Sequence, residues 1–502
     1  MDLLLLSDGS AYHYVLINDL TKLVNFIRKR APRDRNEICR ICFQTCTSND
    51  ILRRHQEICY RQDGIEITMP GPDNDRHVFK IFGARSFVPR IVYFDLESLI
   101  VPVAGPEPDN EKSNTHLIEK HQNYGYAFAA VEFGNPEVVK FELKRGPDSI
   151  EHLLLSLETL AKEVYNEKRR HYAFTGQRET RKEDTSECWI CELPFAWDEE
   201  KVLDHCHYTN KFLGWAHNTC NINRKTTNFI PVVAHNLANY DLHCIIRALN
   251  KSNPHTVFSV IPSTEEKFIS ITISVWIKTF YDKSGKIRNV YENLRFIDSY
   301  KFMQSSLSTL VNNLPPDNFS LLENFFKAKG HSIEKIDLLK RKGFYPYSYI
   351  DSFKKFNEPR LPARRLWTNS LAGGEVSVDR SEFNHAIMVF TKFGCNSIGD
   401  YHDLYLSIDV LLLASVFEAF RSVCYETYGV DCAHYYTASN LAGDVFLKIC
   451  RADLRLLTER DHLHFVEGMI RGGMWSVYDR KYWKANNQIL TTMIKMRKIR
   501  SS

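Results

Sequence analysis

Residues 91–99 read IVYFDLESL, an apolar run that two acids, Asp95 and Glu97, interrupt. The length of the run and its aromatic and β-branched residues predict a buried strand. Side chains two residues apart on a strand project from the same face, so both carboxylates are aimed at one place. Such a pair indicates a chemical site on the strand rather than a position in the packed core.

A second acid-bearing stretch lies further along the chain. Residues 229–243 read FIPVVAHNLANYDLH, an apolar run that feeds a turn. The turn delivers Asp241, and Asn236 and Tyr240 stand beside it in the sequence. The pattern predicts another strand, with a further carboxylate in the turn that follows it.

A third stretch has the spacing of a helix. Residues 404–417 read LYLSIDVLLLASVF, in which leucine, valine and phenylalanine recur at helical intervals. Tyr405 and Asp409 are four residues apart and therefore share one helix face. A tyrosine one turn before an acid can orient an attacking water molecule.

Together these stretches contain the types of residue that a two-metal nuclease requires. Carboxylates in such enzymes bind two divalent cations about 4 Å apart, one activating water and the other stabilising the leaving oxygen. We expect Mg²⁺ or Mn²⁺ on Asp95, Glu97, Asp241 and Asp409. Tyr405 completes the predicted catalytic group, and Asn236 helps to hold the arrangement or the DNA. Each motif alone is unspecific, whereas all three in this order indicate one site.

The residues between these stretches fit one fold. Residues 124–133 and 136–143 predict two strands around a Gly-Asn turn. The following stretch, DSIEHLLLSLETLAKEVYNEK, predicts an amphipathic helix capped by Asp148 or Ser149. An RNase H-like exonuclease has this order of elements, namely three strands, a helix and a fourth strand that leads to an acid. The predicted fold class is therefore α/β.

An N-terminal cluster has the spacing of a zinc finger. A C-x2-C pair is followed, after twelve residues, by an H-x3-C pair on a predicted helix, so that the two pairs face each other. The predicted zinc ligands are Cys39, Cys42, His55 and Cys59. A lone finger serves as a structural staple as often as it reads DNA, and both roles stay open.

A second cluster precedes the predicted strand at residue 229. Its C-x2-C and H-x2-C knuckles predict another zinc ion on Cys188, Cys191, His217 and Cys220. Residues 204–207, DHCH, lie between the knuckles, and the whole pattern resembles the zinc-bound nuclease module of the endonuclease VII (HNH-like) family. The resemblance implies that Asp204, His205 and Asn221 match positions that handle a catalytic metal in that family.

The module departs from that family at two positions. Asn210 stands where the family has a glycine, and Arg224 stands where it carries a metal-binding acid. A missing carboxylate weakens the binding of a catalytic cation. We therefore expect a structural zinc insertion with a vestigial nuclease site at Asp204, His205 and Asn221, and a DNA-nicking enzyme is the alternative.

Composition limits what the chain can be. It has 502 residues, of which 44% are hydrophobic and 25% charged, and this argues against wholesale disorder. A net charge of +4 does not by itself prove a nucleic-acid partner. We expect no signal peptide and no membrane span. The 13 cysteines, largely grouped in the two clusters, indicate a reducing compartment, so we expect an intracellular protein of the nucleus or cytoplasm.

The acidic motifs resemble those of family B DNA polymerases. The 3′–5′ proofreading domain of that family carries the motifs DxE, Nx2-3(F/Y)D and Yx3D. The matching residues are Asp95-Leu96-Glu97, Asn236 to Tyr240-Asp241, and Tyr405 to Asp409. The chain is similar above all to the protein-primed, organellar and viral type, as found in Polinton/Maverick transposons and related viruses, where a DHCH zinc insertion is usual.

The resemblance also implies contacts with DNA. Three further motifs of that family have counterparts in this chain. One is an (S/T)Lx2h motif that binds single-stranded DNA and the terminal protein, and another is a lysine in KRKGFYPYSYID that contacts a phosphate. The third is a YxGG motif, which here has isoleucine in place of tyrosine. The implied DNA-binding residues are Asn236, Tyr240, Ser306, Leu307, Lys342, Gly472 and Gly473. The implied partners are a single-stranded 3′ end, a primer-template and a terminal protein.

The resemblance runs from about residue 10 to residue 487, and the palm motifs A, B and C of the polymerase have no counterpart. We therefore expect the exonuclease half of a transposon or viral DNA polymerase, truncated before the palm and without a complete polymerase site. The expected domains are an N-terminal region (1–75) with the finger, a split exonuclease domain (85–175 and 229–425), the zinc insertion (176–228) and the start of a polymerase domain (426–502). The alternative is a non-catalytic relic or a zinc-bearing DNA-binding protein.

Overall fold

A computed structural model gives the chain a mixed α/β fold, in agreement with the predicted fold class. It describes residues 2–7, 12–27, 37–60, 68–102, 119–171, 185–197, 201–206, 212–224, 228–249, 257–263, 267–368 and 378–469. The chain divides into two compact units. His77–Leu454 form the larger one, and Met1–Arg76 with Arg455–Ser502 form the smaller one.

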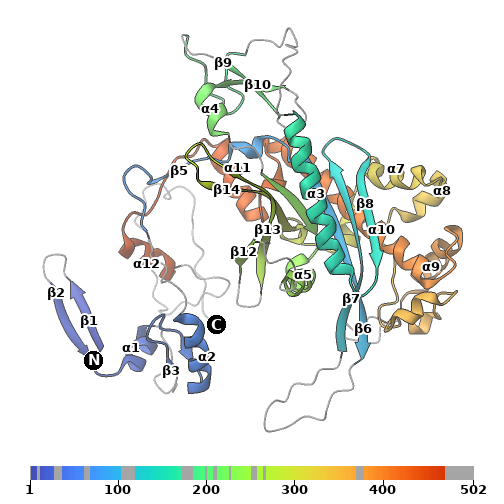
Figure 1. The fold of residues 1–502 in the computed structure, drawn as a ribbon, viewed down its shortest axis with the longest axis horizontal. Coiled ribbons are helices and arrows are strands. Elements are labelled where there is room, and N and C mark those ends of the chain that lie inside the picture. The colour runs from blue at the N-terminus through green and yellow to red at the C-terminus, as the bar shows by residue number, and fades with distance from the viewer. Residues whose placement is uncertain are drawn as a thin grey trace, which may run out of the picture. The chain divides into compact units, whose positions relative to one another are not determined.

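The larger unit is built on a seven-stranded mixed sheet (Figure 1). Its strands, in spatial order, are β12 (Val257–Pro262), β13 (Phe268–Tyr281), β14 (Ile287–Asp298), β11 (Phe229–Ala234), β6 (Arg90–Pro102), β7 (Glu119–Glu132) and β8 (Val138–Arg145). β11 runs parallel to both β6 and β14, and the remaining neighbours are antiparallel. The three parallel strands therefore point their carboxyl ends toward one edge of the sheet.

Helices cover both faces of this sheet. On one face lie α3 (Ser149–His171) and α5 (Asp241–Leu249), and on the other lies α10 (Ile398–Tyr428). The other helices of this unit, apart from the insertion, are α6 (Leu307–Asn312), α7 (Ser320–Ala328), α8 (Ile333–Ile336), α9 (Arg380–Lys392) and α11 (Ala438–Ile449). Short 3-10 helices span Phe82–Arg85, Leu237–Asn239, Ser299–Lys301, Pro316–Phe319, Asp337–Leu339, Phe353–Asn357, Arg364–Leu366 and Cys432–His434.

β6 is apolar along its length because both of its faces are covered. The odd-numbered residues from Ile91 pack in the cluster that contains α10, and the even-numbered residues from Val92 pack in the cluster that contains α3 and α5. Side chains alternate along a strand, so Asp95 and Glu97 continue the odd-numbered row toward α10. The fold thereby aims the two acids of the IVYFDLESL stretch at one helix.

The sequence predicts the elements around β6 well. The strands expected at 124–133 and 136–143 correspond to β7 and β8, and the helix expected from Asp148 or Ser149 corresponds to α3. β7 begins earlier than expected, at the polar residue Glu119, because its first residues pair with the end of β6. The order of three strands, one helix and a fourth strand is also confirmed.

The second cysteine cluster lies in an insertion between α3 and β11. The insertion contains β9 (Lys201–His205), β10 (Phe212–His217) and α4 (Asn218–Asn223), and its two strands form a separate antiparallel sheet. Cys188, Ile190 and Ala216 form a small buried core, against which Phe82 from the segment before β6 also packs. The insertion therefore has a small core of the size that a zinc module has, in contact with the segment before β6.

The smaller unit contains the N-terminal cysteine cluster. Its elements are β1 (Asp2–Ser7), β2 (Tyr12–Ile17), α1 (Leu20–Ile27), β3 (Glu37–Ile38), β4 (Thr45–Cys46), α2 (Asn49–Cys59) and α12 (Arg460–Met469). β1 pairs with β2, and β3 pairs with β4. The short strands β5 (Arg76–His77) and β15 (Leu454–Arg455), where the chain passes from one unit to the other, form a two-stranded sheet. The helix predicted to carry His55 and Cys59 is α2.

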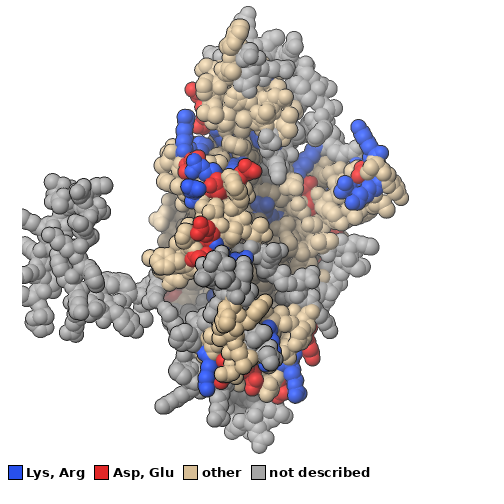
Figure 2. All heavy atoms as spheres, turned by 90° about the vertical axis from the view of Figure 1, so that its left-hand side faces the viewer, with Lys and Arg blue, Asp and Glu red and all other residues tan. Residues whose placement is uncertain are grey.

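Charge is spread in small groups over the surface that Figure 2 draws. Lys and Arg side chains there lie close to Asp and Glu side chains, with uncharged residues between the groups. This distribution agrees with the net charge of +4, and on this face it favours local contacts with a charged partner over one broad basic area.

None of the helices in the described ranges has the length and apolar content needed to cross a membrane.

Candidate active site

Three carboxylates meet between β6 and α10. One oxygen from each of Asp95, Glu97 and Asp409 lies within 4.8 Å of the other two. β6 delivers the first two on the row that faces α10, and α10 delivers the third. Glu97 is 6% exposed and Asp409 is 1% exposed, whereas Asp95 is half-buried, so water reaches the group mainly at Asp95. The structure thus brings together three of the four acids that the sequence predicts as ligands of a divalent metal.

The pKa values of this group reflect crowding of negative charge. Burial, followed by the charge of Asp409, raises the pKa of Asp95 to about 7. Burial and the charges of the two aspartates raise the pKa of Glu97 well above its usual value. Lys342 lowers the pKa of both carboxyl groups, and its Nζ atom lies 2.9 Å from Oδ2 of Asp409. One ammonium group among three acids leaves the site attractive to further cations.

Asp241, the fourth predicted ligand, lies next to this group without being a member of it. It begins α5, directly after the 3-10 turn that follows β11. It is 5% exposed, and burial, followed by the charge of Asp95, raises its pKa. The two aspartates therefore interact electrostatically, although Asp241 does not reach the compact cluster of three.

Asp298, at the end of β14, supports the turn that carries Asp241. Its Oδ2 accepts a hydrogen bond from the backbone N–H of Ala238 at 3.1 Å, and its Oδ1 accepts one from Tyr300 at 3.0 Å. Asn236 opens the same turn in the left-handed conformation, with φ of 62°, which asparagine tolerates better than most residues. Asp298 is not among the residues that the sequence predicts, although an acid at the end of an apolar run, LRFID, was the available signal.

Two tyrosines line the carboxylates. The hydroxyl of Tyr347 donates to Oε1 of Glu97 at 3.3 Å and lies 3.1 Å from the hydroxyl of Tyr405. Burial raises the pKa of both tyrosines, so their hydroxyls stay protonated and can donate hydrogen bonds at neutral pH. The sequence identified Tyr405 but missed Tyr347, which stands five residues after Lys342 in a segment without helical or strand periodicity.

A cleft of about 1170 Å³ opens beside this group. Five residues that the sequence singled out line it, namely Asn236, Ser306, Leu307, Lys342 and Tyr405. Ser306 also caps α6, because its hydroxyl accepts a hydrogen bond from the backbone of Thr309. Tyr240 does not line the cleft, and its hydroxyl bonds to Nδ1 of His121 at 2.7 Å. Gly472 and Gly473 lie outside the described residues.

The donor set of the carboxylate group suits a divalent cation. Among the described residues, no hydrogen-bond donor reaches Oδ1 of Asp409, although this atom is buried. Hard divalent cations prefer carboxylate oxygens, and a buried oxygen without a donor is a costly feature unless something else binds it. Asp95, Glu97 and Asp409 therefore fit Mg²⁺ or Mn²⁺ better than they fit a purely structural role.

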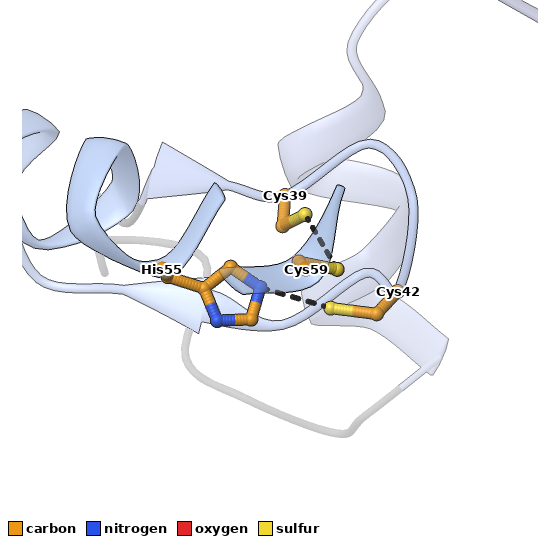
Figure 3. A group of neighbouring side chains, drawn as sticks. All are labelled: Cys39, Cys42, His55 and Cys59. Carbon is orange, nitrogen blue, oxygen red and sulfur yellow. Dashed lines mark hydrogen bonds between the residues drawn. The ribbon is translucent and has the colours of Figure 1, made fainter. Parts of the chain in front are cut away.

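The N-terminal cluster also has the geometry of a metal centre. Its four side chains point toward one another (Figure 3), and one ligand atom from each of Cys39, Cys42, His55 and Cys59 lies within 4.8 Å of the rest. The Sγ atoms of Cys39 and Cys59 are 3.8 Å apart, and Sγ of Cys42 is 3.2 Å from Nε2 of His55. Burial raises the pKa of Cys39, but hydrogen bonds from the backbone and from the side chains of His55 and Cys42 outweigh it and lower the pKa to about 6, which favours a thiolate ligand.

The insertion brings its predicted ligands together in the same way. One ligand atom from each of Cys188, Cys191, His217 and Cys220 lies within 4.8 Å of the rest. In the described part of the insertion, Asp204 and His205 belong to no group of three or more Asp, Glu, His or Cys ligands, and Asp204 instead faces Arg224. His207 and Asn210 lie outside the described residues. The two Cys/His clusters are thus able to hold zinc, and the vestigial nuclease site at Asp204, His205 and Asn221 stays a prediction.

Comparison with known families agrees with the motifs. Residues 220–490, more than half of the chain, match the family described as DNA polymerase type B, organellar and viral. The chain belongs to this family, so its function is related to that of type B DNA polymerases, with DNA as partner and divalent metal as the cofactor of the family's chemistry. Comparisons with curated proteins and with solved structures give no match.

Proposed function

We propose that this chain degrades DNA from the 3′ end, as the exonuclease part of a transposon or viral DNA polymerase. The observation that carries the proposal is the group of Asp95, Glu97 and Asp409 beside an open cleft. The order of β6, β7, β8, α3 and β11, with β11 parallel to β6, supports an RNase H-like fold for the split domain at 85–175 and 229–425. Membership of a DNA polymerase family supports DNA as the substrate.

The carboxylates define where the chemistry takes place. In the two-metal arrangement that we propose, Asp95, Glu97 and Asp409, together with Asp241, would hold cations that supply an activated water and stabilise the leaving oxygen. The hydroxyls of Tyr347 and Tyr405 are protonated donors at the edge of this group and would orient the water. Lys342 would contact the phosphate of the 3′-terminal nucleotide through its charge.

The cleft supports a single strand as the substrate. Tyr300 and Phe344 line it in addition to the two tyrosines of the site, and aromatic faces stack on unpaired bases. Its volume of about 1170 Å³ exceeds the roughly 300–1,000 Å³ that is usual for sites of small molecules. A polymer end therefore fits the cleft better than a free nucleotide does.

The test is degradation of a 5′-labelled single-stranded oligonucleotide in Mg²⁺ or Mn²⁺. Wild-type protein should shorten it from the 3′ end, and Asp95→Ala and Asp409→Ala should each lower the rate by roughly a hundredfold or more, because each removes a ligand of the proposed metals. Asp337→Ala, which changes an exposed acid, is the matched control and should keep the wild-type rate. Equal digestion by wild type and both site variants would show a contaminating nuclease, and digestion by none would favour a non-catalytic relic.

We propose further that the two Cys/His clusters hold structural zinc. Four ligands within 4.8 Å support a closed tetrahedral site in each case. Because the free energy of zinc binding contributes directly to folding, such clusters depend on their metal for a defined structure. Elemental analysis should therefore find two zinc ions per chain, and a folded protein without zinc would contradict the assignment.

A further inference from the structure

In the endonuclease VII-like pattern, the carboxylate of Asp204 would bind a catalytic cation. In this chain the same carboxylate pairs with an arginine. Nη2 of Arg224 donates to Oδ1 of Asp204 at 2.8 Å, and Nε lies 2.7 Å from Oδ2. The side chains are 5% and 1% exposed, respectively. Both carboxylate oxygens thus face one guanidinium in a buried environment, where an unpaired charge would be strongly destabilising.

The surroundings of the pair leave little room for a divalent ion. Nε1 of Trp189 donates to Oδ2 of Asp204 at 3.2 Å, and the guanidinium of Arg224 lies 5.5 Å from the centroid of the same indole ring. Nη2 of Arg224 also donates to the backbone oxygen of His205 at 3.3 Å. In a nuclease centre the metal supplies the positive charge, whereas here the side chain of Arg224 supplies it.

The same arginine reaches out of the insertion. Its Nη1 donates to Oγ of Ser86, in the segment that leads into β6, at 3.3 Å. The neighbouring Arg85 points the opposite way, into the insertion, where it donates to the backbone oxygen of Ile190 at 2.5 Å and pairs with Glu192 at 2.6 Å. Two arginines therefore cross the same boundary in opposite directions, one from each side.

We propose that Arg224 takes the place of the catalytic cation and converts the former nuclease centre into a fastening between the zinc module and the segment before β6. The module binds no divalent cation at Asp204, and its buried ion pair instead fixes the module to the sheet domain at Ser86. The proposal does not rest on the exonuclease activity, since none of these residues belongs to the carboxylate group or its cleft.

Hydrogen exchange of the zinc-loaded full chain tests the fastening. Arg224→Gln should raise the exchange rate of backbone amides in residues 185–197 and 212–224 by about tenfold or more, because the module opens more often. Its zinc content should stay at the wild-type level. Ser86→Ala should raise the same rates to a smaller extent, because it removes only the bond across the boundary. Arg288→Gln is the matched control, since it breaks an exposed Arg–Asp pair in the hairpin of β13 and β14, and it should change nothing.

Mn²⁺ titration tests the replacement of the cation. In an Asp95→Ala/Asp409→Ala protein, which lacks the carboxylate group, we expect no bound Mn²⁺ that depends on Asp204. Mn²⁺ that binds to this protein and is lost on a further Asp204→Asn change would overturn the proposal. Unchanged exchange in both Arg224→Gln and Ser86→Ala would overturn the fastening. If Arg224→Gln does not fold, Ser86→Ala and the Mn²⁺ titration still decide.

Discussion

The ammonium group of Lys342 lies 2.9 Å from Oδ2 of Asp409 and 5.9 Å from the centroid of the Tyr405 ring. One lysine therefore contacts both residues of the Yx3D motif on α10. Its charge also lowers the pKa of Asp95 and of Glu97, against the effects of burial and of the neighbouring acids. The lysine consequently links the ionisation of the carboxylate group to the position at which we propose that a phosphate binds.

The first prediction concerns Lys342→Met. Without the ammonium group, the pKa values of Asp95 and Glu97 should rise further, because the interaction that lowers them is gone. The pH at which degradation of single-stranded DNA reaches half of its maximal rate should therefore shift upward. Rate measurements between about pH 6 and pH 9 check this shift. A lower rate with an unchanged pH midpoint would mean that Lys342 acts on the DNA alone.

The second prediction concerns stability without metal. The pKa of Asp95 is 3.8 in an unfolded chain and about 7 in the folded one, so the folded protein holds a proton that the unfolded chain has lost between these values. Stability should therefore fall as the pH rises from about 4 to about 7, and a divalent cation that binds the ionised group should restore it. Mg²⁺ should raise the melting temperature more at about pH 8 than at about pH 6.

Asp95→Asn is the control for this experiment. The amide keeps the size of the side chain but does not titrate, so the dependence of the Mg²⁺ effect on pH should become weaker. Glu97, whose pKa is also raised, would supply the part that is left. A Mg²⁺ effect that is the same in Asp95→Asn and in wild type at both pH values would contradict this account.

The third prediction concerns Tyr347→Phe. The change removes a hydroxyl that contacts Glu97 and Tyr405, and keeps the ring. We expect a roughly tenfold to hundredfold lower maximal rate of degradation with a similar affinity for the oligonucleotide, because the hydroxyl orients groups at the site and the ring lines the cleft. Tyr349→Phe is a matched control, since its hydroxyl bonds to Glu358 instead. A pure loss of affinity would place Tyr347 in DNA binding only.

The parts of the site that the sequence predicts are those that local patterns encode. β6 is covered on both faces, which forces a continuous apolar run, and the two acids stand out against it. The spacing of Tyr405 and Asp409 on α10 and the cysteine spacings are equally local. Each of these features depends on residues within a few positions of one another, so periodicity and spacing alone are enough to find them.

The parts that the sequence missed depend on contacts between distant segments. Tyr347 reaches Glu97 across 250 positions, and Asp298 reaches Ala238 across 60. Only the parallel pairing of β11 with β14 places Asp298 beside the turn before Asp241. The place of Asp241 beside the other three acids likewise depends on the turn between β11 and α5, which Asn236 opens. Sequence spacing contains no measure of these distances.

The fourth prediction concerns the N-terminal cluster. Cys42→Ser should remove one of two zinc ions per chain, because serine is a poor ligand for this metal, and the second cluster should keep its own. The backbone amides of α2 should then exchange faster, since the two ligands on this helix lose their metal. Cys46→Ser, at a buried cysteine outside the cluster, is the matched control. Loss of both zinc ions would mean that the clusters are not independent.

The last prediction concerns a buried ion pair that fixes α10 relative to β6. Arg421 and Asp431 are both 0% exposed, and Nη2 of the arginine lies 2.6 Å from Oδ2 of the aspartate. Nη2 also donates to the backbone oxygen of Val88 at 2.9 Å, and the same carboxylate oxygen accepts from the backbone N–H of Val88 at 2.8 Å. The pair therefore connects the C-terminal part of α10 to the segment from which β6 starts.

Arg421→Met should leave the carboxylate of Asp431 buried without its counter-charge. Removal of one partner of a buried pair costs about 3–5 kcal/mol, so urea unfolding should show a free energy of unfolding that is lower by about this amount. Arg288→Met, which breaks an exposed pair with Asp282, should change it by less than about 0.5 kcal/mol. If Arg421→Met were equally mild, α10 would be held against β6 by apolar packing and by the hydrogen bond from the Tyr93 hydroxyl to Glu418. The carboxylate group would then owe its geometry to the core cluster rather than to this pair, because Asp409 reaches Asp95 and Glu97 only through the position of α10.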